Sequence, residues 1–90
     1  MKSVIEAIRQ LQGPILITGA GGFVGANLLR MITEVREDVF GIIKGKDNWR
    51  VESLNGLRNG QVINADLTEP SIVKALLSRV NPRTVFDCMA

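Results

Sequence analysis

The 90-residue sequence contains no tyrosine and no histidine, and its only cysteine is Cys88. After the carboxylates, histidine and tyrosine are the side chains most used as general acids and bases near neutral pH. The sequence therefore lacks the usual groups for completing an acid–base reaction alone. A single cysteine cannot form an internal disulfide, and without histidine no structural zinc site is expected. We predict no metal site and a reducing, cytoplasmic setting.

Long apolar runs and clusters of basic residues are also missing. No stretch approaches the ~20 apolar residues of a membrane span. Glu6 and Arg9 interrupt the apolar run that a secretory signal would need. The 11 basic residues stand against 9 acidic residues and are scattered, whereas a nucleic-acid-binding surface requires a basic stripe. We therefore predict neither a nucleic acid nor a membrane as a partner.

What the chain does contain is the composition of a globular domain. Hydrophobic residues make up 46% and charged residues 22%, which argues against disordered and collagen-like classes. Ninety residues suffice for at most one small domain, since domains usually run to roughly 100 to 150 residues. We predict one unit, residues 1–90, in which a leading helix over 1–12 precedes a segment over 14–90.

Helical and strand patterns alternate along the sequence. Ser3 and Glu6 fit a capping box, which predicts Ser3 as the N-cap of the leading helix. Thr68 is the expected N-cap of a later helix that has Pro70 in its first turn. The expected strands cover residues 15–18, 39–43, 61–64 and 84–89, and the expected helices cover 22–35 and 68–81, with a single helical turn over 49–54. Such alternation predicts an α/β fold, an open parallel sheet with helices on both faces.

A glycine-rich turn lies between the first strand and the first crossover helix. Gly19, Gly22 and Gly25 have the spacing G-x-x-G-x-x-G, and no Gly-Lys-Ser/Thr follows, which excludes a P-loop. Gly19 permits the tight turn, Gly22 lets the backbone approach a pyrophosphate, and Gly25 lets the helix pack close to the sheet. The phosphates would bind free N–H groups at the helix N-terminus.

These glycines could simply make a tight turn, but their position after a strand and before a helix favours a dinucleotide site. The predicted cofactor-binding residues of this turn are Gly19, Ala20, Gly21, Gly22, Phe23, Val24 and Gly25.

The segment from Ile15 to Gly25 resembles the cofactor fingerprint of the extended short-chain dehydrogenase/reductase family, the NAD(P)-dependent epimerases and dehydratases of nucleotide sugars. Asp66 and Leu67 resemble its adenine-contacting pair, and the resemblance covers about residues 14–90. It implies a Rossmann-type sheet of about four strands in the usual order 3-2-1-4, truncated relative to a full doubly wound domain. Without the resemblance, Asp66 would be read as a carboxylate at the start of a helix.

The end of the chain resembles the family's fourth strand, which ends at the ribose. The resemblance therefore implies Met89 and Ala90 as cofactor contacts. This sequence has Met89-Ala90 where the family usually has a small or aliphatic pair, and Asp87 where it often has histidine. The sequence does not identify a partner for Asp87. Cys88 lies among apolar neighbours, which indicates an inert core cysteine.

The residue after the second strand bears on the choice of dinucleotide. An acidic residue there accepts hydrogen bonds from the ribose 2′-OH of NAD, and a basic residue accommodates the 2′-phosphate of NADP. Lys44 occupies this position and Lys46 follows, which favours NADP over NAD. One charge-assisted contact would contribute about 1.5 to 3 kcal/mol. Alternatively, both lysines are solvated and Asp47 holds NAD. Trp49 could cover the adenine, although a lone aromatic residue more often packs.

The family implies reversible hydride transfer between a sugar carbon and nicotinamide, with a Tyr-x-x-x-Lys pair. No catalytic residue is carried over, because the sequence has no tyrosine. We expect these residues to be the N-terminal cofactor-binding part of a longer enzyme, whose missing C-terminal part binds the nucleotide-sugar substrate. The alternative is a non-catalytic dinucleotide-binding module, a redox sensor or scaffold. An RNA-binding protein has little support, given the net charge of +2.

The order 3-2-1-4 would leave the fourth strand at an edge. Val85, Phe86 and Met89 would then lie beside unpaired backbone. We therefore predict that the 90 residues alone self-associate, as a homo-oligomer, or are marginally stable.

Overall fold

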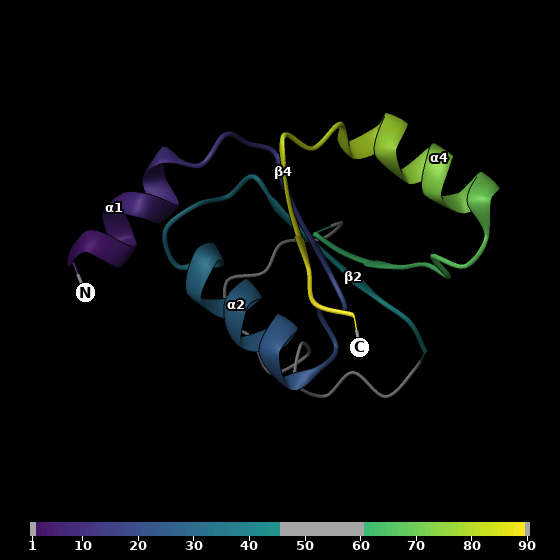
Figure 1. Cartoon of the computed structure of the whole chain (residues 1–90), viewed down its shortest axis with the longest axis horizontal. Helices are drawn as coiled ribbons and strands as arrows, with labels where there is room; N and C mark the ends of the chain where they lie inside the picture. The colour runs from purple at the N-terminus through teal and green to yellow at the C-terminus, as the bar shows by residue number, and fades with distance from the viewer. Residues whose placement is uncertain (1, 46–60, 90) are drawn as a thin grey trace.

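The computed structural model describes residues 2–45 and 61–89 (Figure 1). Within these residues, four parallel strands form one sheet in the order β3-β2-β1-β4, which confirms the predicted architecture. The predicted turn over 49–54 and the candidate residues Lys46, Asp47, Trp49 and Ala90 lie outside the described residues. The strands are β1 (Ile15–Thr18), β2 (Val39–Ile43), β3 (Val62–Asn64) and β4 (Thr84–Asp87), and the helices are α1 (Lys2–Gln10), α2 (Phe23–Thr33) and α4 (Pro70–Val80).

The central strand β1 explains why its sequence is apolar without alternation. All four of its residues are buried, because β2 and β4 flank it and helices cover both faces. Ile15 and Ile17 belong to a core cluster with residues of α1 and α2, whereas Leu16 packs with residues of α4 on the other face. Figure 1 shows α2 and α4 on opposite sides of the sheet. Helices on both faces are therefore confirmed.

Two predicted helix caps are wrong. Ser3 lies inside α1, which begins at Lys2. The N-cap of α4 is Glu69 and no side chain caps this helix, while the Thr68 hydroxyl donates to Asp66 Oδ1 at 2.6 Å. Ser and Thr side chains readily bond to local groups outside helices, and this local turn competes with capping. Pro70 does lie in the first turn of α4, as expected.

The edge strands are shorter than the sequence pattern predicts. β3 begins at Val62, and the side-chain amide of the preceding Gln61 donates to the carbonyl oxygens of Glu37 and Val39 at 2.8 and 3.1 Å. β4 ends at Asp87, two residues before the predicted end at Met89. Beyond β4, the chain turns toward the glycine-rich segment.

The leading helix α1 is attached through Arg36, which follows α2. Its guanidinium donates to the carbonyl oxygen of Ile8 at 3.0 Å and to that of Leu11. Asp38 holds the same guanidinium through two hydrogen bonds of 2.9 and 2.6 Å. A cation at the C-terminal end of a helix also interacts favourably with the helix dipole.

None of the described helices is long and apolar enough to cross a membrane.

Candidate functional site

A pocket of about 590 Å³ opens where the strands end at their carboxyl side. This edge lies next to the point at which the strand order reverses, because β2 and β4 lie on opposite sides of β1. Open α/β sheets bind ligands at such switch points. The pocket is lined by Gly19, Gly21, Gly22, Ile42, Ile43, Lys44, Ala65, Asp66, Leu67, Thr68, Cys88 and Met89.

Two of the three spaced glycines are required by the fold itself. Gly19 has a φ of +66°, and a Cβ on it would lie 2.7 Å from the carbonyl carbon and oxygen of Cys88. A Cβ on Gly25 would lie 2.1 Å from the carbonyl oxygen of Gly19. Cβ atoms do not approach backbone this closely, so Gly19 permits the turn and Gly25 permits α2 to pack onto it.

Gly22 differs, because the protein leaves room for a side chain there. A Cβ on Gly22 would meet only the Gly19 carbonyl oxygen at 3.5 Å, an ordinary van der Waals distance. Its φ of −80° is open to any residue, and no side chain caps the N-terminus of α2. Because the first turn of a helix leaves backbone N–H groups without intrahelical partners, this end of α2 suits an anion.

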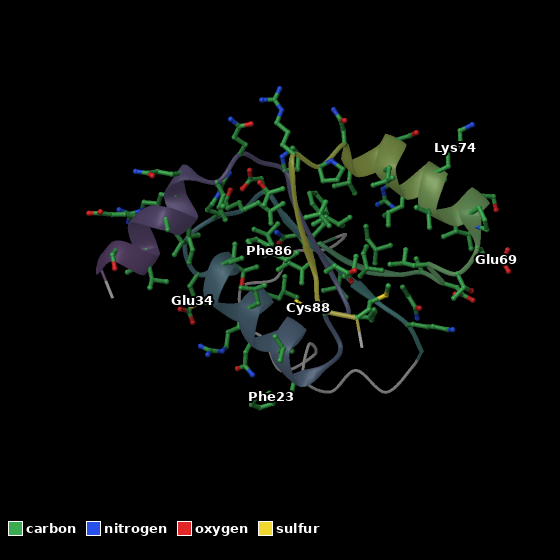
Figure 2. The ribbon with its side chains drawn as sticks, viewed as in Figure 1. Phe23, Glu34, Glu69, Lys74, Phe86 and Cys88 are labelled. Atoms are coloured by element: carbon green, nitrogen blue, oxygen red, sulfur yellow. The ribbon has the colours of Figure 1, made fainter. Side chains whose placement is uncertain are left out.

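The other predicted residues of the turn surround the pocket without lining it. Ala20 is fully buried, and its N–H donates to the carbonyl oxygen of Ile42 at 3.0 Å. Phe23 and Val24 are 71% and 67% exposed on the first turn of α2. Figure 2 shows Phe23 at the N-terminal end of the helix, pointing away from the sheet.

Two charged groups meet on the side of β2 and β3. Lys44 Nζ lies 3.6 Å from Asp66 Oδ1, and both residues line the pocket. The hydroxyl and the N–H of Thr68 donate to the same oxygen at 2.6 and 3.0 Å. The Thr68 hydrogen bonds, together with the nearby Lys44 ammonium, lower the pKa of Asp66 below its ordinary value. Asp66 is therefore ionised at neutral pH and faces a cation.

The opposite side of the pocket is the turn after β4, which contains Cys88 and Met89. Thr18 Oγ1 donates to Asp87 Oδ1 at 2.7 Å, and the Met89 N–H donates to the same atom at 3.2 Å. These two hydrogen bonds, that from Thr18 first, lower the pKa of Asp87. Cys88 packs against the core and also lines the pocket, so it is less enclosed than the sequence suggests (Figure 2).

The structure thus brings together seven of the predicted residues as pocket lining: Gly19, Gly21, Gly22, Lys44, Asp66, Leu67 and Met89. Sequence reasoning missed the apolar walls Ile42, Ile43 and Ala65 and the Thr68 hydroxyl. Their position in the sequence could have identified them, because they end β2 or follow β3 and the carboxyl ends of parallel strands meet at one edge of the sheet. Sequence reasoning also missed Thr18 as the hydrogen-bond partner of Asp87, since 69 positions separate the two residues.

These features fit a dinucleotide. The pocket offers apolar walls for a base, an open helix N-terminus for phosphates and an ammonium group at the end of β2. The profile of the NAD dependent epimerase/dehydratase family matches residues 15–90, which include every strand of the sheet and both α2 and α4. A comparison with curated proteins finds no match. The family match covers most of the chain and agrees with the Rossmann-like sheet, and the chain therefore belongs to the NAD dependent epimerase/dehydratase family.

Proposed function

We propose that the chain binds NADP in preference to NAD, with the 2′-phosphate on Lys44. The observation that carries this proposal is that Lys44, directly after β2, lines the pocket. This is the position at which a carboxylate would select the 2′-hydroxyl of NAD. The Lys44 side chain is 68% exposed, so its ammonium can turn from Asp66 to a phosphate without leaving a buried charge behind.

The remaining contacts follow the shape of the pocket. The pyrophosphate binds the first turn of α2 beside Gly22. The adenine contacts the adjacent residues Asp66 and Leu67. The Asp66 carboxylate accepts a hydrogen bond from the adenine amino group. Bound nicotinamide would supply a hydride donor or acceptor. Among the described residues that line the pocket, only Lys44, Asp66 and Cys88 carry titratable side chains.

We further propose that residues 14–90 are the cofactor-binding segment of an extended short-chain dehydrogenase/reductase acting on a nucleotide sugar, with residues 1–12 as a leading helix. The family match supports an enzyme of the epimerase/dehydratase kind. The sequence contains no tyrosine, so residues 1–90 do not supply a Tyr-x-x-x-Lys pair. A non-catalytic dinucleotide-binding module is the alternative, and an assay for the conversion of nucleotide sugars into epimerised, dehydrated or reduced products by the enzyme that contains this segment separates the two.

Titration with both dinucleotides tests the cofactor proposal. NADP is expected to bind about tenfold or more tightly than NAD, and Lys44→Ala should remove that difference. Lys74→Ala, an exposed lysine on α4 outside the pocket lining, is the matched control and should change neither affinity. Tighter binding of NAD that Lys44→Ala leaves unchanged would overturn the preference and would favour NAD as the cofactor.

A further inference from the structure

One side-chain hydrogen bond joins the two strands at the switch point of the sheet. Thr18 ends β1 and Asp87 ends β4, and the two residues are direct partners in the strand register. The Thr18 hydroxyl donates to Asp87 Oδ1 at 2.7 Å. Thr18 is only 8% exposed, so its hydroxyl is held in place within the sheet. This pair lies at the point where an open parallel sheet places its ligand.

The same carboxylate oxygen holds the backbone that forms one wall of the pocket. The Met89 N–H donates to Asp87 Oδ1 at 3.2 Å, and the Cys88 N–H donates to the carbonyl oxygen of Thr18 at 3.1 Å. The turn also lies directly against Gly19, on which a Cβ would come within 2.8 Å of the Met89 nitrogen. Cys88 and Met89 line the pocket, whereas Asp87 does not. Asp87 therefore lies next to this wall, and its hydrogen bonds hold the wall in place.

We propose that Asp87 is a positioning residue for the nicotinamide half of the dinucleotide, acting through the Thr18 hydroxyl and the Met89 N–H. The proposal rests on the proposed dinucleotide binding. Lys44 after β2 marks the adenosine ribose, and the glycine turn after β1 marks the pyrophosphate. A dinucleotide that continues in the same direction along the strand order reaches the end of β4. Asp87 thus affects one half of the ligand and leaves the other half alone.

A purely structural role for the pair predicts a different outcome. If Thr18 and Asp87 only stabilised the sheet, their loss would reduce the binding of every ligand of the pocket to a similar degree. Two ligands separate these cases. NADPH contains both halves of the dinucleotide, and adenosine 2′,5′-bisphosphate contains only the adenosine half.

The test is titration of the chain and its variants with both ligands at a temperature at which circular dichroism shows each variant to be folded. Asp87→Ala and Thr18→Val should each weaken NADPH about tenfold but weaken adenosine 2′,5′-bisphosphate less than about twofold. The double variant should bind no more weakly than Asp87→Ala, because Asp87→Ala already breaks the Thr18 contact along with the Met89 contact. Asp87→Asn and Thr18→Ser keep an acceptor and a hydroxyl and should stay within about threefold of the parent for NADPH.

Thr33→Val is the matched control, because it removes a threonine hydroxyl that donates to the Leu29 carbonyl oxygen within α2. It should change neither affinity. An equal loss for both ligands, or unchanged NADPH affinity in Asp87→Ala and Thr18→Val, overturns the positioning role and leaves dinucleotide binding standing. If the unsubstituted chain binds neither ligand, the proposed function fails, and the positioning role fails with it. If Asp87→Ala does not fold, the affinities of Thr18→Val and Thr18→Ser for the two ligands decide whether the positioning role holds.

Discussion

At the scale of single residues, the three spaced glycines differ in what a methyl group would meet. At Gly25 a Cβ would lie 2.1 Å from backbone, and at Gly19 it would lie 2.7 Å from backbone with φ positive. At Gly22 it would lie at an ordinary 3.5 Å. Gly19 and Gly25 are therefore explained by the fold alone, whereas the fold leaves room for a side chain at Gly22.

Two alanine substitutions separate these roles by stability. Gly25→Ala should reduce the free energy of unfolding by about 3 kcal/mol or prevent folding, because backbone must move to admit the methyl group. Gly22→Ala should reduce it by less than about 1 kcal/mol, the usual difference between glycine and alanine at an N-cap. Urea denaturation measures both changes, and equal losses would contradict the distinction between these two glycines.

Two ionised aspartates predict how stability depends on pH. The pKa values of Asp66 and Asp87 are both lowered in the folded chain, chiefly by hydrogen bonds from Thr68 and Thr18. A carboxyl whose pKa is lower in the folded state stabilises the fold above its ordinary pKa, and this contribution is lost as the pH falls through the folded value. The free energy of unfolding should therefore fall as the pH drops below the ordinary aspartate value of 3.8.

The variant that tests this is Asp66→Asn combined with Asp87→Asn. Its free energy of unfolding should decline less steeply on acidification than that of the parent, as measured by urea denaturation between neutral pH and about pH 3. Parallel decline in the two proteins would show that other groups cause the acid sensitivity.

The residue scale also shows where prediction from sequence ends. The glycine spacing located the turn, and Lys44, Asp66, Leu67 and Met89 do line the pocket. The partner of Asp87 could not be found, because only the strand register brings Thr18 beside it. Thr68 was misread as an N-cap, since its hydroxyl can accept a hydrogen bond from a helix N–H or donate one to Asp66, and the sequence does not rank the two.

At the scale of elements, α1 lies outside the residues that the family profile matches, which begin at residue 15. It contributes Ile8 to the core, and Arg36 holds its C-terminal end through the carbonyl oxygens of Ile8 and Leu11. The Arg36 side chain is 15% exposed, so its hydrogen bonds are largely shielded from water. Arg36 and Asp38 therefore join an added helix to the sheet.

Arg36→Ala should destabilise the chain by about 2 kcal/mol, because charged hydrogen bonds are lost and carbonyl oxygens lose their donor. The matched control is Arg30→Ala, which breaks an exposed pair with Glu34 at 3.4 Å within α2. The control should cost less than about 0.5 kcal/mol. Thermal unfolding measures both, and a similar small loss in the two variants would mean that Arg36 does not secure α1.

The elements were mostly predictable, because each has its own periodicity. An uninterrupted apolar run marked β1 as buried on both faces, and amphipathic spacing marked the helices. The ends were less predictable. β4 stops at Asp87, and the turn that follows lies against Gly19, with the Cys88 N–H donating to the Thr18 carbonyl oxygen. These contacts depend on tertiary structure.

At the scale of the whole molecule, the strand order places β4 at an edge of the described sheet. Val85 on this strand is 52% exposed, and Met89 beyond it is 53% exposed. Phe86, the third apolar residue predicted on this edge, packs against the core beside α2 (Figure 2). An edge strand with exposed apolar side chains is a template for pairing with another chain.

The 90 residues by themselves should therefore associate as their concentration rises, and Val85→Lys should reduce this association, because a charge on an edge strand opposes pairing. Ser78→Lys, at an exposed position of α4, adds the same charge without removing an apolar side chain and should have little effect on the association. Light scattering over a range of concentrations measures the association. A monomeric parent, or equal effects of the two lysines, would count against the edge as the cause.

Strand–helix alternation predicted an open parallel sheet with helices on both faces. The strand order 3-2-1-4 came from the resemblance to the extended short-chain dehydrogenase/reductase family. The choice between NADP and NAD did not follow from the sequence, because it depends on how Lys44 is shared between Asp66 and a ligand. That sharing is a balance of interactions across two strands, which no local pattern encodes.

The most direct test of the central claim is a dinucleotide titration of the parent chain and Gly22→Ala, with Ser78→Ala as a control on α4. If the open end of α2 binds the pyrophosphate, the parent and Ser78→Ala should bind NADPH alike. Gly22→Ala should remain folded but bind about tenfold or more weakly, which corresponds to ~1.4 kcal/mol. Absence of NADPH binding by the folded parent, or equal binding by Gly22→Ala, would contradict the claim that this turn holds a dinucleotide.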